Sequence, residues 1–288
     1  MVTWDKYDFY EPLHAHNWAL ERQEHVYKSK HPLKNKDVFS YVMEKLLDSW
    51  SPEQIAGRLD VDHPDDPYWH ICSETIYTYI FAPQNKGKNL WEYLRRKQKR
   101  RRKKAGRKAH RVRIPDRVSI HDRPLVVAER VEIGHWEGDS IVGKGHANGL
   151  HTAYERVSSL TRFERMERLT AEESVKAQLK IYTPLPNEMR KTVTLDNGSE
   201  HTNHAVIKEQ LNIQAYFADP YASWQRGGNE NANLWIRYYF PKGTDFSMIS
   251  DEELHDVELE LNNRPRKRLG YKTPLEVFNN YLRGCDRN

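Results

Sequence analysis

The chain has 288 residues, which is long enough for about two domains. Its 8 Trp, 16 Tyr and 8 Phe supply enough large apolar surface to exclude a wholly disordered chain. No run approaches the roughly 20 apolar residues that span a bilayer, and the charged first residues are unlike a secretory signal peptide. Cys72 and Cys285 are too few for a disulfide framework, and neither belongs to a Cys-x-x-Cys zinc pair. We therefore expect a cytoplasmic protein with no membrane partner.

Residues 1–94 are predicted to form a small, all-helical region. One helix is expected over residues 33–47, where apolar side chains recur at four-residue spacing. Ser51 begins a second helix, because a serine cap, a proline at the first helical position and a glutamine at the third make a capping box. A third helix is expected to begin at Ser73.

This third helix is the candidate for DNA recognition. Ile76 and Ile80 lie four residues apart and are predicted to point inward, which leaves a polar face exposed. We interpret residues 51–81 as a helix-turn-helix whose second helix enters a major groove. A plain helical packing module is the alternative, because the 13-residue connection 60–72 is longer than the roughly 3 to 4 residues of a tight helix-turn-helix. The residues expected to contact DNA are Glu74, Thr75, Tyr77 and Thr78.

Positive charge is concentrated in one segment. Between Arg95 and Arg113 lie 13 Lys or Arg and no acid, whereas the rest of the chain has 33 basic and 41 acidic residues. Such dense like charge resists compaction and favours a polyanionic partner, so we interpret residues 95–118 as an arm that contacts DNA phosphates. A solvated linker without a ligand is the alternative. The central residues of the expected contact are Arg100, Arg101, Arg102, Lys103 and Lys104.

Downstream of the arm the pattern changes to that of strands. Residues 133–142 alternate, which places Trp136 and Ser140 on one face and Glu137 and Asp139 on the other. Further strands are expected at residues 152–158, 162–169, 191–195 and 213–217, with helices at 203–211 and after the caps Thr170, Ser250 and Thr273. This order predicts a mixed α/β sheet of five strands with flanking helices.

Three acidic residues lie at the ends of these elements. Asp139 is near the end of the first strand, Asp196 follows the fourth strand in an Asp-Asn-Gly turn, and Glu230 is expected in the first turns of a later helix. If the two strands are neighbours, the carboxylates of Asp139 and Asp196 face each other. Clustered carboxylates favour a hard divalent cation such as Mg²⁺. Each acid taken alone is more typical of a turn or a helix cap, so the prediction depends on the three together.

Five segments are typical of one family, namely residues 135–139, 194–198, 218–231, 239–245 and 261–274. Together they resemble the IS30 family of bacterial insertion-sequence transposases, over about residues 133–278. Residues 50–59 and 73–77 also resemble the inner helix-turn-helix of that family. The resemblance implies a ribonuclease H-like catalytic domain over residues 119–288. Within it, the metal-binding Asp-Asp-Glu triad would be Asp139, Asp196 and Glu230.

The same resemblance implies a reaction and its partners. It implies metal-dependent cleavage and strand transfer of double-stranded DNA, at terminal inverted repeats and target DNA, by a homo-oligomer associated with the bacterial nucleoid. Two Mg²⁺ ions are expected, with Mn²⁺ able to substitute, and no small-molecule cofactor. The candidates for DNA contacts near the scissile phosphate are Arg226, Lys242, Gln225 and Asn229.

One departure from the family keeps other functions open. Members usually carry another helix-turn-helix ahead of the inner one, and residues 1–27 contain no capped helix pair to match it. A shortened DNA-binding regulator that does not complete transposition is therefore an alternative. A stand-alone metal-dependent nuclease, which hydrolyses DNA without joining it, is another.

Two histidines follow the second acid of the triad. His201 and His204 lie three residues apart after Glu200, and they lack the His-Glu-x-x-His order of a zinc protease. We interpret them as satisfied surface histidines rather than metal ligands.

Overall fold

The computed structural model describes residues 16–19, 33–94, 114–220 and 222–285. The chain divides into two compact units, Met1–Arg102 and Lys103–Asn288. The basic segment 95–113, which includes the five residues expected to contact phosphates, lies outside the described residues. In the part of the chain that the structure describes, no helix combines the length and apolar character needed to cross a membrane.

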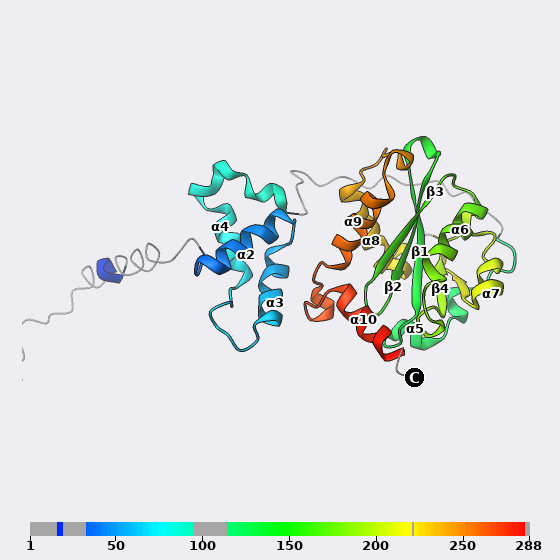
Figure 1. Ribbon diagram of the computed structural model, residues 1–288, viewed down its shortest axis with the longest axis horizontal. Coiled ribbons are helices and arrows are strands. Elements are labelled where there is room, and N and C mark those ends of the chain that lie inside the picture. The colour runs from blue at the N-terminus through cyan, green and yellow to red at the C-terminus, as the bar shows by residue number, and fades with distance from the viewer. Residues whose placement is uncertain (1–15, 20–32, 95–113, 221, 286–288) are drawn as a thin grey trace, which may run out of the picture. The chain divides into compact units, whose positions relative to one another are not determined.

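The first unit packs three helices, α2 (Lys36–Leu47), α3 (Pro52–Asp62) and α4 (Ser73–Phe81), shown in Figure 1. The predicted capping box at Ser51 is present, because its hydroxyl accepts from the Gln54 backbone N–H and the Gln54 side chain accepts in return. Ile76 and Ile80 are buried, as their spacing predicted. The core of this unit is apolar and includes Val42, Leu46, Ile55 and Leu59.

One detail of this unit differs from the sequence prediction. Helix α3 continues to Asp62, so the connection to α4 comprises residues 63–72 rather than 60–72. Helix α4 begins at Ser73, as predicted, and the side chain of the preceding Cys72 makes no cap hydrogen bond. The connection remains longer than that of a tight helix-turn-helix.

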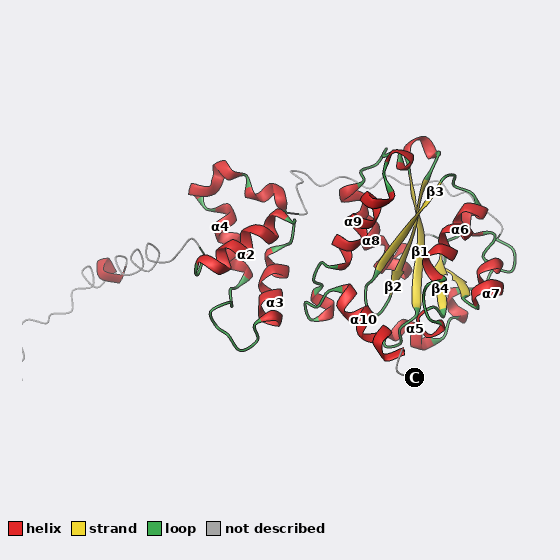
Figure 2. Ribbon diagram, in the orientation of Figure 1, coloured by secondary structure: helices red, strands yellow, loops and turns green. Residues whose placement is uncertain are grey.

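The second unit contains a five-stranded mixed sheet, with the strands in the order β3-β2-β1-β4-β5 (Figure 2). Strand β1 pairs antiparallel with β2 and parallel with β4, which in turn pairs parallel with β5. The strands are β1 (His135–Val142), β2 (Gly149–Glu155), β3 (Thr161–Met166), β4 (Thr192–Leu195) and β5 (Gln214–Phe217). The expected mixed five-stranded sheet with flanking helices is thereby confirmed. Two strands differ from their predicted bounds by three residues: β2 spans Gly149–Glu155 rather than 152–158, and β3 ends at Met166 rather than at residue 169.

Helices cover both faces of this sheet (Figure 1). They are α5 (Leu125–Glu129), α6 (Ala171–Tyr182), α7 (Ala205–Leu211), α8 (Gly227–Tyr239), α9 (Asp251–Asn262) and α10 (Pro274–Cys285). One apolar cluster joins Trp136 of β1 to side chains of α6 and α7, and a second joins Ile141 of β1 to side chains of α8 and α9. The predicted alternation along β1 is therefore confirmed, and the face that carries Glu137 and Asp139 is the one covered by α8.

The described chain enters this unit at Ile114, which is buried in the core. Val118 already accepts a hydrogen bond from the Phe217 backbone N–H, and Arg117 donates to the Ala218 carbonyl. The last residues of the predicted arm, 114–118, thus lie against the edge strand β5.

Candidate active site

The two aspartates of the predicted triad lie side by side. Strands β1 and β4 are parallel neighbours, with His135 opposite Thr192, and continuing four residues along both chains brings Asp139 level with Asp196. Strand β4 ends at Leu195, whereas β1 continues past Asp139 because it stays paired with β2. Both carboxylates are partly exposed, with side-chain exposures of 25% and 33%. The end of β4 and the middle of β1 therefore place two partly exposed carboxylates side by side within the sheet.

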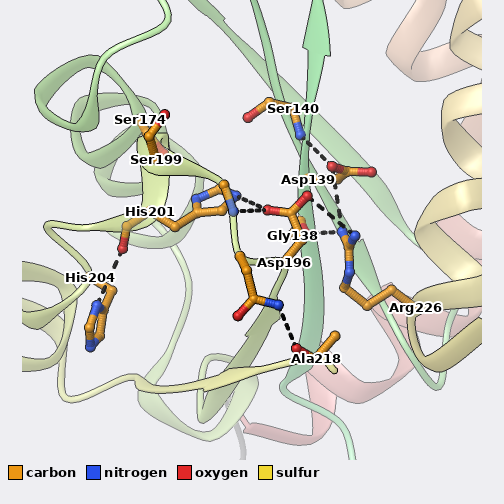
Figure 3. A network of polar contacts seen from close by, with 12 residues as sticks. Gly138, Asp139, Ser140, Ser174, Asp196, Ser199, His201, His204, Ala218 and Arg226 are labelled. Carbon is orange, nitrogen blue, oxygen red and sulfur yellow. Dashed lines mark hydrogen bonds and ion pairs between the residues drawn. The ribbon is translucent and has the colours of Figure 1, made fainter. Parts of the chain in front are cut away.

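Arg226 lies between these carboxylates (Figure 3). Its guanidinium nitrogens are 3.5 Å from Asp139 Oδ1 and 3.4 Å from Asp196 Oδ2, and Nη1 donates to the Gly138 carbonyl at 2.9 Å. The side chain is 11% exposed. Arg226 holds this position because it immediately precedes α8, whose first turn is attached to β1. A single cation thus contacts both acids.

Asn229 attaches the first turn of α8 to the sheet. It is fully buried, its backbone N–H donates to Glu137 Oε2 at 2.9 Å, and its amide nitrogen donates to the Glu137 carbonyl at 3.1 Å. Its amide oxygen accepts from the hydroxyl of Thr152 on β2. Glu137 is itself buried and is paired with the buried Arg156. Asn229 therefore positions the helix, and its side chain is not presented at the surface.

Glu230 is in the first turn of α8, as predicted, and its side chain is exposed. Arg226, Glu230 and Asn233 follow each other at spacings of four and three residues, so they share one face of the helix. Both neighbours on that face reach the aspartates, since Asn233 Nδ2 donates to Asp139 Oδ2 at 3.0 Å. Within the described residues, the Glu230 side chain makes no hydrogen bond or ion pair. It lies on the face of α8 that is turned toward Asp139 and is free to take a ligand.

The two aspartates differ in proton affinity. Burial, the largest influence, raises the pKa of Asp139 above its ordinary value despite the nearby charge of Arg226. Burial alone would also raise the pKa of Asp196, but the contact with His201 and the charge of Arg226 outweigh it and hold that pKa well below its ordinary value. The pair therefore combines a firmly ionised carboxylate with one that takes up a proton more readily.

The prediction that His201 and His204 are surface residues is wrong, because both are buried. His201 is in the 3-10 turn Ser199–His201 that follows the Asp-Asn-Gly sequence, and this turn directs its ring back toward Asp196. Its Nε2 lies 3.3 Å from Asp196 Oδ1. His204 instead packs edge-on against Phe217.

The remaining predicted contacts are distributed over several places. Both ends of the Gln225 amide are bonded to Asp219, which closes the loop before α8. Lys242 is exposed in the segment after α8. On α4, Glu74, Thr75 and Thr78 are exposed and Tyr77 is half-buried, so this helix presents the predicted polar face.

Sequence reasoning missed Asn233, which contacts Asp139, and Arg117, which contacts the residue after Asp196. Asn233 is three residues after Glu230, and helical spacing from that residue was the signal available for it. Arg117 donates from Nε to Oδ1 of Asn197, the residue after Asp196. No local pattern connects residues 80 positions apart, so only the fold reveals this contact.

Several curated proteins are similar to this chain. The transposase for insertion sequence element IS4351 of Bacteroides fragilis is 38% identical over 248 residues, which cover 84% of this chain and 74% of the relative. The transposase for IS1086 of Cupriavidus metallidurans is 38% identical, covering 82% of this chain and 71% of the relative. The transposase InsI for IS30A of Escherichia coli K12 is 36% identical, with coverages of 82% and 63%.

Solved structures with a similar chain include two from retroviral systems. One is the intasome of simian T-cell lymphotropic virus in complex with a PP2A regulatory subunit, at 20% identity, covering 50% of this chain and 54% of that chain, with a TM-score of 0.41. The other is the catalytic core domain of BIV integrase, at 19% identity, with coverages of 52% and 96% and a TM-score of 0.41. No family model matches the chain.

The curated relatives, taken with the sheet that sets two carboxylates side by side, define a class. The protein is a transposase, a polynucleotidyl transferase of the Asp-Asp-Glu type. Because relatives at 36–38% identity cover most of its length, the chain belongs to the IS30 family of insertion-sequence transposases.

Proposed function

We propose that this transposase cleaves and joins double-stranded DNA at the terminal inverted repeats of its element, with Asp139, Asp196 and Glu230 as its catalytic triad. The observation that carries the proposal is the level placement of Asp139 and Asp196 on neighbouring strands, beside the face of α8 that bears Glu230. Mg²⁺ is the expected metal, as two ions, and Mn²⁺ is a substitute.

The donor set suits such ions. Asp139 and Asp196 offer oxygen ligands side by side on two neighbouring strands. The positively charged guanidinium of Arg226 contacts both carboxylates, so the pair can bind a cation between them. Glu230 adds a third oxygen ligand that no other side chain engages within the described residues. Bound divalent ions supply activation of the attacking oxygen and stabilisation of the leaving oxygen at a phosphodiester.

Other residues of the chain would position the triad and contact the DNA phosphates. Asn229 and Glu137 fix the start of α8 against β1 and β2, so Glu230 projects from an anchored helix rather than from a loop. Arg226 contacts Asp139 at 3.5 Å and donates a long hydrogen bond of 3.4 Å to Asp196, and a scissile phosphate would compete for the same guanidinium. Lys242, exposed after α8, is a second candidate for phosphate contact.

DNA binding is assigned to the first unit and to the basic segment. The exposed side chains of α4, Glu74, Thr75 and Thr78, with the half-buried Tyr77, form the face proposed to read base edges. The 13 basic residues from Arg95 to Arg113 would bind phosphates and make affinity fall steeply with salt. Homo-oligomers on DNA and location at the bacterial nucleoid belong to the same proposal.

The experiment is a Mg²⁺-dependent cleavage and joining assay on DNA that carries the sequences flanking the gene. Glu230→Gln keeps the shape of the side chain but removes its charge, and it is expected to lower cleavage by at least about 10³-fold while leaving DNA binding intact. Glu209→Gln, an exposed carboxylate on α7, is the matched control and is expected to cleave at the wild-type rate.

The products of this assay distinguish the three candidate functions. Joined products that disappear in Glu230→Gln support transposition by this triad. Hydrolysis without joining favours the stand-alone nuclease, and binding without either product favours the DNA-binding regulator. Normal cleavage by Glu230→Gln would show that the triad is wrongly assigned.

A further inference from the structure

The two oxygens of Asp196 face different partners. Oδ2 lies 3.4 Å from Arg226, on the side of Asp139, whereas Oδ1 lies 3.3 Å from His201 Nε2. Figure 3 shows Asp196 between His201 on one side and Asp139 with Arg226 on the other. The His201 side of the carboxylate takes no part in the proposed triad, and its contacts require a separate explanation.

His201 is a buried polar group without a hydrogen bond. Its side chain has 0% exposure, and neither ring nitrogen has a hydrogen-bonding partner in the described part of the chain. Nε2 lies at ion-pair distance from Asp196 Oδ1, at 3.3 Å, without the geometry of a hydrogen bond. Buried polar groups normally make hydrogen bonds, so a buried imidazole that makes none, beside a carboxylate, is placed to take a further partner.

A second carboxylate completes the group. Single ligand atoms of Asp196, Glu200 and His201 all lie within 4.8 Å of one another. Metal bonds to nitrogen and oxygen are about 2.1 Å long, so ligand atoms around one ion lie within about 4.2 Å of each other. The present spread of up to 4.8 Å is slightly wider than this limit, so the three donors must move closer together to hold one ion.

The backbone makes room for this arrangement at Gly198. A Cβ added there would stand 2.5 Å from Glu200 Oε2 and 2.8 Å from Glu200 Oε1, so the Glu200 carboxylate lies folded over the glycine. Gly198 also donates its N–H to Asp196 Oδ1 at 2.9 Å. Its φ of −70° suits any residue, so the absent side chain matters here through space and not through backbone conformation.

We propose that Asp196, Glu200 and His201 form a divalent metal site with a nitrogen ligand, which takes a transition-metal ion such as Zn²⁺ or Mn²⁺. An imidazole among carboxylates favours these ions, whereas an all-oxygen set favours Mg²⁺. The site shares Asp196 with the proposed triad, so this carboxylate bridges two metal positions. The inference goes beyond the proposed function, and it stands on contacts that the triad does not use.

The test loads the full-length protein with Mn²⁺ and looks for nitrogen coupling to the ion by pulsed electron paramagnetic resonance. Coupling is expected in the wild type and absent in His201→Phe, which fills the buried volume without a nitrogen. Calorimetry with Zn²⁺ is expected to give at least about tenfold weaker binding in the same variant. His255→Asn removes an exposed histidine and is expected to change neither result.

Two further variants avoid the core. Glu200→Gln changes a half-buried ligand, and Gly198→Ala displaces the Glu200 carboxylate without removing any donor, so both are expected to weaken Zn²⁺ binding about tenfold or more. Glu230→Gln is expected to lose cleavage and keep the nitrogen-coupled ion, which separates this inference from the triad. Mn²⁺ that binds without nitrogen coupling, coupling that persists in His201→Phe, or Zn²⁺ affinity unchanged in Glu200→Gln would overturn the proposal.

Discussion

In the first unit, the buried polar side chains among the described residues are Ser49 and Asn85, whereas the second unit buries charged groups such as Glu137, Arg156 and Arg264. The first unit is therefore held together by apolar packing, and its proposed DNA-reading face is the exposed side of α4. The second unit uses its interior to fix side chains around the aspartates. Charged side chains are thus absent from the described interior of the first unit, whereas in the second unit buried charged side chains hold the elements around the aspartates in place.

The largest effect is expected from breaking the buried pair of Glu137 and Arg156. Arg156→Met leaves the more distant Arg130, at 4.0 Å, as the ion-pair partner of the buried Glu137 among the described residues, and is expected to cost about 3 kcal/mol of unfolding free energy. The matched control is Arg58→Met on α3, whose pair with Asp62 is partly exposed and is expected to contribute less than about 1 kcal/mol. Urea unfolding measures both, and equal losses would contradict the contrast between the units.

The second-largest effect is expected from changing the exposed face of α4, and it should alter DNA affinity but not stability. Replacing Thr75 and Thr78 by Ala removes exposed hydroxyls and no core contact, so we expect DNA binding weakened by about tenfold and stability nearly unchanged. Cleavage of the DNA that remains bound should be unaffected. Fluorescence anisotropy with specific and random duplexes measures the change, and wild-type affinity for both would exclude this face from recognition.

The stability of the second unit is expected to depend on pH through a buried histidine, His135. Burial lowers the pKa of His135 below its ordinary value of 6.5, although Glu132 opposes this. The unfolded chain therefore binds more protons below about pH 6.5, and the stability present above that pH is lost as the pH falls toward the folded-state pKa. His135→Gln is expected to reduce the loss between pH 7.5 and 5 by on the order of 1 kcal/mol.

The smallest effect concerns helix capping in the first unit. Ser51→Ala removes a complete capping box and is expected to cost about 1 kcal/mol. Cys72, before α4, makes no cap hydrogen bond, so Cys72→Ala should cost clearly less. Thermal unfolding followed by circular dichroism ranks the two, and the reverse order would indicate that the caps act differently in solution.

Much of this architecture was predictable from local sequence patterns. The alternation along β1 and the caps at Thr170 and Ser250 were correct, because a strand pairing or a helix start depends on nearby residues. The level placement of Asp139 and Asp196 followed once β1 and β4 were neighbours.

The surroundings of the aspartates were not predictable in the same way. His201 looked like a surface residue because its burial depends on a turn that folds it under Asp196. Asn229 looked like a DNA contact because no local pattern reveals its hydrogen bonds to Glu137 and Thr152 on two strands. Long-range contacts decide both positions, and a single sequence contains no direct record of them.

The central claim is that Glu230 joins the two aspartates in binding the catalytic metal. Because Glu230 is exposed and makes no hydrogen bond or ion pair among the described residues, Glu230→Cys should leave the fold intact. The most direct measurement is single-turnover DNA cleavage by this variant, with Mg²⁺ and with Mn²⁺. A thiolate binds softer ions better, so we expect cleavage to be lost with Mg²⁺ and partly restored with Mn²⁺. Cleavage at the wild-type rate with Mg²⁺ would contradict the account.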